Sequence, residues 1–169
     1  MALRSIARTV RSKLPKGVRS VLLLDPSPSA TPPLDLLRLS TCLRESGYDV
    51  SLHRGAAANA NMLPDVAIVT GVFSWDLPAV RRELGWIADN WDCERYLTGV
   101  LARREGPPLA DSLGALMLAT GSMEARLDEL TPDYSLVPDW LCSILITSKF
   151  EYRPSAGLAI CPRACEVRC

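Results

Sequence analysis

The stretch Val18-Arg-Ser-Val-Leu-Leu-Leu-Asp25 decides the fold. Its four consecutive apolar residues, Val21 to Leu24, form a short run of the kind found in strands that are buried on both faces of a parallel sheet. The run ends at Asp25, because four of the nine residues from 25 to 33 are proline, which continues neither a strand nor a helix. The sequence therefore predicts a buried strand followed by a loop.

Helical and strand patterns alternate after this loop. A helix is predicted from the Pro32-Pro33 pair to Ser46, with Gly47 ending it in a left-handed conformation. A second helix is predicted near residues 74–91, with its charged residues facing away from the core: Arg81, Arg82, Glu83, Asp89 and Asp92. Further strands are predicted at 48–53, 66–69, 96–102, 115–119 and 143–147, a loop at 103–112 and a short helix at 122–130.

This alternation predicts the fold class. Strands that alternate with helices pair in parallel through right-handed crossovers. We therefore predict an α/β fold, in which an open, doubly wound, mostly parallel sheet of the Rossmann-like, flavodoxin-like kind is followed by an extended C-terminal tail. The predicted organisation is a basic N-terminal segment at 1–17, expected to be a frayed helix, a Rossmann-like domain at 18–130, and a connector with its tail at 131–169.

The composition excludes several functional classes. The 169 residues are 48% apolar and 22% charged, which is ordinary for one globular domain. Because 19 Lys and Arg are balanced by 19 Asp and Glu, the chain lacks the excess positive charge of nucleic-acid binders. No apolar run approaches the roughly 20 residues that span a bilayer. The N-terminus also lacks the apolar region of a secretion signal, so we expect a cytoplasmic, reducing location without a disulfide framework.

Three common motifs are absent from the sequence. It has no GxGxxG after the first strand, no GxxxxGK[ST] and no GxSxG, which disfavours a dinucleotide site, a P-loop and an α/β-hydrolase. His53 is the single histidine, and a lone histidine at a strand end is more often structural than catalytic.

The loops after the first and third strands carry groups that suit a ligand. In parallel sheets, ligands bind beyond the carboxyl ends of the strands. Small hydroxyl and backbone donors follow Asp25 and Thr70 there, and Phe73 and Trp75 offer apolar contact. The alternative interpretation is that proline and serine form a turn while the two aromatic residues cap the core.

Several segments, taken in order, resemble the cobalamin-binding domain found in front of radical S-adenosylmethionine enzymes. They are Val21-Leu-Leu-Leu-Asp25, Pro32-Pro-Leu-Asp-Leu-Leu-Arg-Leu39, Leu43-Arg-Glu-Ser-Gly-Tyr-Asp-Val50 and Leu63-Pro-Asp-Val-Ala-Ile-Val-Thr70. Segments 133–139 and 143–148 are similar to the family's connector into its barrel. Asp35 stands where the family pattern usually has glycine.

The resemblance implies a cobalamin held over the strand ends. The implied cofactor-binding residues are Asp25, Pro26, Ser27, Ser29, Thr70, Gly71, Phe73 and Ser74. Since the sequence has no DxHxxG motif, the resemblance implies no histidine ligand to the cobalt.

The C-terminal cysteines bear on a second cofactor. The family carries a CxxxCxxC loop that holds a [4Fe–4S] cluster and leaves one iron for S-adenosylmethionine. Here Cys161 and Cys165 match the first spacing, Cys169 comes one residue too late, and residues 150–160 intervene. Two interpretations stay open: these three cysteines are a partial metal site, or the tail after Lys149 is out of register, as in a truncated or frame-disrupted product. A zinc site would lack a fourth ligand.

The resemblance thus implies a cobalamin-binding module that is the N-terminal part of a B12-dependent radical enzyme, without catalysis of its own. One alternative is an enzyme fragment that works with a barrel supplied in trans. The other is a non-catalytic interaction domain that self-associates.

Overall fold

The computed structural model describes residues 2–27, 32–118 and 126–137. The chain divides into two compact units, 1–137 and 138–169, and all described residues belong to the first. The strand predicted at 143–147, residues 122–125 of the helix predicted at 122–130 and the tail after Lys149 lie outside the described residues.

Among the described residues, five parallel strands form one sheet. They are β1 (Ser20–Asp25), β2 (Asp49–Arg54), β3 (Val66–Thr70), β4 (Glu94–Thr98) and β5 (Leu116–Met117). Their order is β2-β1-β3-β4-β5, and each neighbouring pair is parallel. This is the flavodoxin-like order of doubly wound sheets, so the predicted fold class is confirmed.

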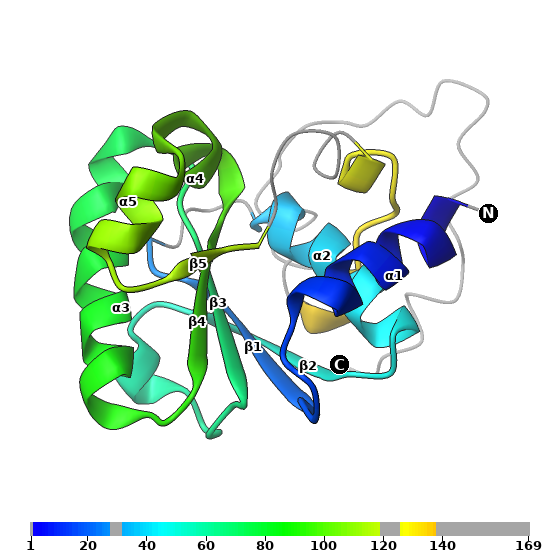
Figure 1. Cartoon of the computed structure of the whole chain (residues 1–169), viewed down its shortest axis with the longest axis horizontal. Helices are drawn as coiled ribbons and strands as arrows, with labels where there is room; N and C mark the ends of the chain where they lie inside the picture. Colours follow the sequence, from blue (N-terminus) through cyan, green and yellow to red (C-terminus); the bar gives the residue numbers. More distant parts are fainter. Residues whose placement is uncertain (1, 28–31, 119–125, 138–169) are drawn as a thin grey trace, which may run out of the picture. The chain divides into compact units, whose positions relative to one another are not determined.

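Helices cover both faces of the sheet (Figure 1). Helices α1 (Ala2–Lys13) and α2 (Leu34–Glu45) lie on one face. Helices α3 (Leu77–Asn90), α4 (Gly99–Glu105) and α5 (Pro107–Ser112) lie on the other. Residues of β1 alternate between the two apolar clusters, with Leu23 in the first and Leu24 in the second. Both side chains are fully buried, as the continuous apolar run predicts. In the part of the chain that the structure describes, no helix combines the length and hydropathy that a bilayer crossing requires.

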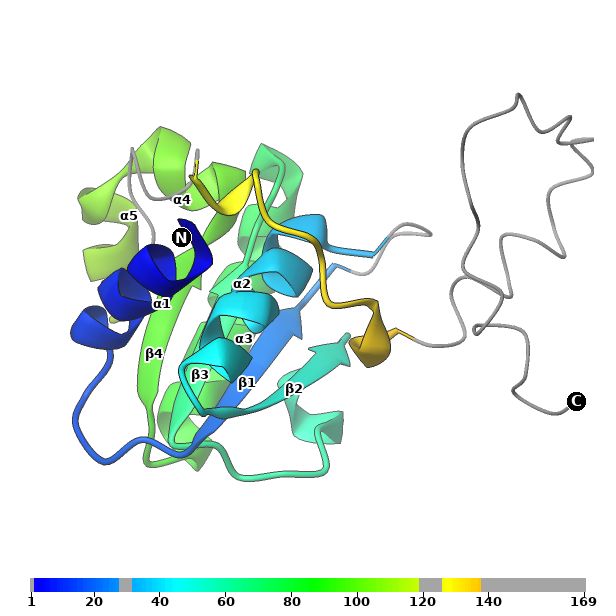
Figure 2. The same ribbon diagram turned by 90° about the vertical axis from the view of Figure 1, so that its right-hand side faces the viewer.

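Helix α1 is part of the core, although its basic sequence predicted a frayed helix. It packs along α2 (Figure 2) and buries Ile6, Val10 and Leu14 in the first apolar cluster. The hydroxyl group of Tyr96 on β4 also donates to the Lys13 carbonyl oxygen at 2.9 Å. The spacing of these apolar residues gives α1 a face that covers the sheet, which the basic residues on its other side obscured.

The end of α2 is as predicted. Gly47 has a φ of +87°, and its N–H donates to the Arg44 carbonyl oxygen at 2.9 Å. The N–H of Tyr48 donates to the Leu43 carbonyl oxygen at 3.1 Å, which completes a Schellman motif. This tight ending turns the chain directly into β2.

The prediction for residues 96–112 is wrong in its second half. Strand β4 ends at Thr98, and Gly99 begins α4 with a φ of +87°. The N–H of Leu101 donates to the Gly71 carbonyl oxygen at 2.8 Å, which ties the helix to the end of β3. Residues 103–112, predicted as a loop, complete α4 and form α5. The β-branched and aromatic residues before Gly99 concealed this boundary.

Glu83 was predicted to face away from the core, but the structure places it inside the core. Its side chain is buried within α3, and the residue is only 2% exposed. The N–H of Ala57, which begins the short 3₁₀ turn η1 (Ala57–Asn59), donates to its Oε2 at 2.8 Å. Arg82 Nε donates to its Oε1 at 2.7 Å. The buried carboxylate therefore holds the β2–β3 connection against α3. In the predicted connector 131–140, a further short 3₁₀ turn, η3 (Tyr134–Leu136), is present.

Candidate functional site

A cavity of about 400 Å³ opens at the carboxyl ends of β1 and β3. The strand order reverses between these two strands, which is where doubly wound proteins bind ligands. Its volume falls near the lower end of the roughly 300–1,000 Å³ typical of small-molecule pockets. The lining residues are Asp25, Ser27, Pro32, Pro33, Leu34, Asp35, Thr70, Gly71, Val72, Phe73, Trp75, Asp76 and Val100.

The β1 side of the cavity ends in an ion pair. Arg54 Nε, at the end of β2, lies 3.1 Å from Asp25 Oδ2. The two residues are register partners in the sheet, so their side chains lie on the same face. Asp25 is nearly buried, and the guanidinium compensates its charge.

The loop after β3 is shaped by Asp76, the last residue of the turn η2 (Ser74–Asp76). Its Oδ2 accepts the N–H groups of Val72 and Phe73, at 3.0 and 2.8 Å. These bonds fix the direction in which the loop leaves the sheet. The carboxylate is buried, and it is hydrogen-bonded to the backbone of its own loop.

The floor of the cavity joins α2 to the ends of β3 and β4. Thr70 Oγ1 donates a hydrogen bond to Asp35 Oδ2. Burial raises the pKa of the Asp35 carboxyl group above its ordinary value, although the Thr70 hydrogen bond works in the opposite direction. Gly99 allows this approach, because an added Cβ would overlap Thr70 Oγ1 and lie 2.8 Å from the Gly71 carbonyl oxygen.

Aromatic and aliphatic side chains surround the mouth of the cavity. Phe73 and Trp75 stack with ring centroids 4.3 Å apart and an interplanar angle of 16°. They are 50% and 71% exposed, so they do not cap the core. We call the exposed apolar residues at this mouth the apolar rim: Leu34, Val72, Phe73, Trp75 and Val100. An exposed, prestacked aromatic pair of this kind offers a flat surface to a ligand ring.

The residues predicted from the sequence are only partly brought together. Five of them line the cavity: Asp25, Ser27, Thr70, Gly71 and Phe73. Pro26 is buried and Ser74 is exposed, and neither lines it, while Ser29 lies outside the described residues. Gly71 also allows close packing, because a Cβ there would lie 2.8 Å from Leu101 Cδ2 and 3.1 Å from Val80 Cγ2.

Asp35 is a residue of the candidate site that the sequence did not predict. The residue lines the cavity and also a second, smaller hollow of about 120 Å³. That hollow contains Arg38 and Arg103, and Arg38 Nη1 is 2.7 Å from Asp128 Oδ1. The available signal was the acid at a position where the resembling family has glycine.

The described residues hold no candidate metal centre. Within them, no group of three His, Cys, Asp or Glu side chains could hold a metal ion. His53 is the penultimate residue of β2 and does not line the cavity. Burial raises the pKa of the Cys42 thiol to about 11, as expected of a buried structural cysteine. Cys161, Cys165 and Cys169 lie outside the described residues.

Comparison with known proteins gives a structural likeness but no sequence match. No protein-family model matches the chain, and neither does any curated protein sequence. A solved structure of a cobalamin-binding protein from Desulfitobacterium hafniense DCB-2 matches with 15% identity and a TM-score of 0.49. The match covers 73% of this chain and 62% of that chain, less than two thirds of its length. A likeness at this level carries no argument about a shared ligand.

Proposed function

We propose that this chain is a cobalamin-binding module. The observation that carries the proposal is the cavity at the carboxyl ends of β1 and β3 with its apolar rim. The segments that resemble the cobalamin-binding family, 21–25, 32–39 and 63–70, supply β1, α2 and β3 around this cavity. Sequence resemblance and cavity position therefore support the same ligand.

The residues present suit part of a corrinoid. A cobalamin is larger than the cavity, so one portion would enter while the ring lies over the mouth. Phe73 and Trp75 would provide the apolar contact to the ring, and Ser27 and Thr70 would provide hydroxyl groups. When bound, cobalamin would supply a cobalt centre able to carry an alkyl group. The chain's own contribution is to bind and orient it.

Titration with hydroxocobalamin tests the proposal. We expect the protein to retain the cofactor through desalting and to shift its visible spectrum. Trp75→Ala should weaken binding about tenfold, because it removes a large apolar contact, and burying such a side chain is worth roughly 1.5–3 kcal/mol. Leu63→Ala removes another exposed apolar side chain, 78% exposed and away from the cavity, and should leave affinity unchanged. Absence of retained cofactor in the wild-type protein would overturn the proposal.

We further propose that the module belongs to a B12-dependent radical S-adenosylmethionine enzyme, whose barrel would be joined to it or supplied in trans. The support is the resemblance of segments 133–139 and 143–148 to the family's connector, together with the cysteines at 161, 165 and 169. Anaerobic iron–sulfur reconstitution followed by EPR tests the cluster. A signal that Cys161→Ala abolishes would support the site, and a signal unchanged by this variant would reject it.

Self-association through the apolar rim is a second candidate function. Five exposed apolar residues around one cavity favour it, because contiguous exposed apolar surface marks interaction sites. Light scattering over a range of protein concentrations tests it. A dimer that hydroxocobalamin does not dissociate, and that Trp75→Asp does dissociate, would favour this function over cofactor binding.

A further inference from the structure

The charges around the cavity are unbalanced. Asp25, Asp35 and Asp76 line it, and no described lining residue is basic. The neighbouring loop residues 28–31 are Pro, Ser, Ala and Thr, so they add no charge wherever they lie. A cavity with this lining presents a negative potential to an incoming ligand.

Two of the three carboxylates have a compensating partner within the protein. Arg54 compensates Asp25, and Asp76 accepts two N–H groups of its own loop. Asp35 forms no ion pair with another described residue, and Thr70 donates its hydroxyl group to Oδ2. Arg38 and Arg103 line the smaller hollow on the other side of Asp35, where Arg38 pairs with Asp128.

The position of Asp35 on α2 matters for ligand choice. It lies in the first turn of a 12-residue helix whose start faces the cavity, and helix starts attract anions. In doubly wound folds this place is used for ligand phosphates. Here a side-chain carboxylate already supplies the negative charge there, and Thr70 donates to it from the neighbouring strand.

We propose that Asp35 is a built-in anion that makes this part of the cavity exclude phosphate and carboxylate groups and accept an amide N–H group of the ligand instead. The inference rests on the proposed function, since it specifies which corrinoids the cavity takes: those whose ring side chains are amides rather than acids. Besides the Thr70 hydroxyl group, backbone N–H groups of Leu36 and of Asp35 itself hydrogen-bond to this carboxylate. Its remaining lone pairs would accept an amide N–H, whereas a second carboxylate at this place would be repelled. Burial, which raises the pKa of Asp35, is consistent with a charge that no cation compensates.

Paired corrinoids test the inference on the full chain. Cobinamide carries amide side chains, and cobyrinic acid carries carboxylic acids on the same ring. We expect wild-type protein to bind cobinamide at least about tenfold more tightly than cobyrinic acid. Asp35→Asn keeps an oxygen for Thr70 and removes the charge, so the preference should narrow to within about threefold. Asp89→Asn, the same charge change at an exposed position of α3, should leave it unchanged.

A second measurement needs no corrinoid. Asp35→Gly vacates the start of α2, so inorganic phosphate should raise its Tm by about 2 °C or more relative to sodium chloride of equal ionic strength. The wild-type Tm should not rise. If neither corrinoid binds, the proposed function fails, and the phosphate result still decides the role of Asp35. Equal affinity for both corrinoids in the wild type, an unchanged preference in Asp35→Asn, or no phosphate response in Asp35→Gly would overturn the inference.

Discussion

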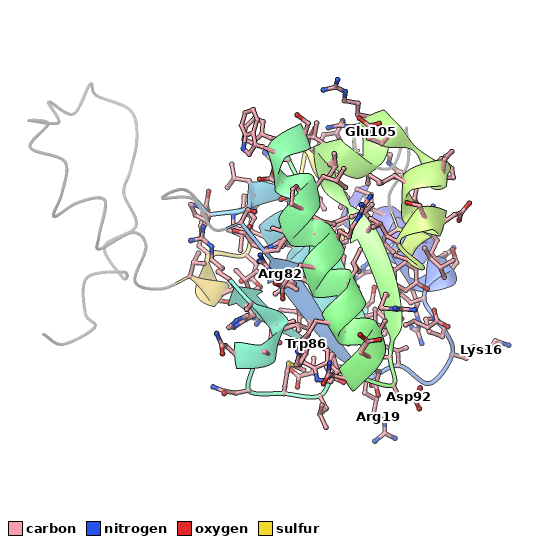
Figure 3. The ribbon with its side chains drawn as sticks, turned by 90° about the vertical axis from the view of Figure 1, so that its left-hand side faces the viewer. Lys16, Arg19, Arg82, Trp86, Asp92 and Glu105 are labelled. Atoms are coloured by element: carbon pink, nitrogen blue, oxygen red, sulfur yellow. The ribbon has the colours of Figure 1, made fainter. Side chains whose placement is uncertain are left out.

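Two hollows of similar size lie at opposite ends of the sheet. The cavity at the carboxyl ends measures about 400 Å³, and a hollow at the amino ends about 440 Å³. Figure 3 shows Lys16, Arg19 and Asp92 at the amino-end edge and Glu105 at the opposite edge. The amino-end hollow contains Lys16, Asp92 and Glu94, which are charged groups exposed to water, whereas the other has an apolar rim and buried acids. Volume therefore does not distinguish a candidate site, and the chemistry of the lining does.

The contrast is clearest in two aspartates. Asp65, at the amino end of β3, is exposed and accepts the N–H groups of Arg19 and Ser20 at 2.8 and 2.9 Å, which lowers its pKa. The pKa of Asp35, at the other end, is raised by burial. The first carboxylate strengthens the fold by joining β1 to β3, and the second costs the fold stability while it remains charged. Each of the following predictions tests this difference.

The largest effect is expected from Gly99→Ala. The positive φ and the overlap of the new Cβ with Thr70 and Gly71 should destabilise the protein by about 2–4 kcal/mol and disrupt the cavity floor. Urea unfolding measures the stability, and cobalamin titration measures the site. Gly85→Ala is the matched control: nothing lies within 4 Å of its Cβ, so it should stabilise α3 by up to about 1 kcal/mol. Equal stability of the two variants would contradict the assignment.

A smaller effect is expected when the stability of aspartate variants is measured as a function of pH. Its sign should be opposite for the aspartates at the two ends of the sheet. Asp65 has a lowered folded pKa, so its contribution is present above the ordinary value of 3.8 and is lost as the pH falls through the folded pKa. Asp65→Asn should therefore be less stable than wild type near neutral pH, with a gap that closes in acid. The pKa of Asp35 is raised in the folded state, so ionisation of this carboxyl group destabilises the fold. This destabilisation is complete above the folded pKa and absent below the ordinary value of 3.8. Asp35→Asn should be more stable than wild type near neutral pH and equal to it in acid. Urea unfolding across this pH range checks both signs, and parallel curves for the two variants would refute the contrast.

The smallest effect is expected from Lys16→Ala in the amino-end hollow. The side chain is exposed, so stability should change by no more than about 0.5 kcal/mol. Cobalamin affinity should be unchanged, because the residue lies at the edge opposite to the proposed site. A tenfold loss of affinity in this variant would place the ligand at the wrong end of the sheet.

Local chemistry made much of the fold predictable from sequence. The run Val21 to Leu24 predicted a doubly covered strand, and Gly47 predicted the end of α2, because both signals depend on residues close in the chain. The start of α4 was missed, since Gly99 adopts its conformation only when Gly71 and Thr70 lie beside it. Glu83 was misplaced for the same reason, because its partner Ala57 is 26 residues away.

The candidate site was predictable in position more than in chemistry. Strand alternation located the ends of β1 and β3, and five predicted residues line the cavity there. The floor depends on a contact between Asp35 and Thr70, which are 35 residues apart, and no local pattern indicates such a pair. The negative lining likewise emerges only when three aspartates from separate elements converge.

The packing of α1 has a consequence for the order in which the protein matures during translation. Helix α1 leaves the ribosome early, but Tyr96, which donates to its Lys13 carbonyl oxygen, follows 83 residues later. Until α2 and β4 have been synthesised, the side chains of Ile6, Val10 and Leu14 have no apolar surface to pack against. The apolar face of α1 is therefore exposed to solvent during much of the synthesis of the chain. We expect the nascent chain to depend most on chaperones in this interval.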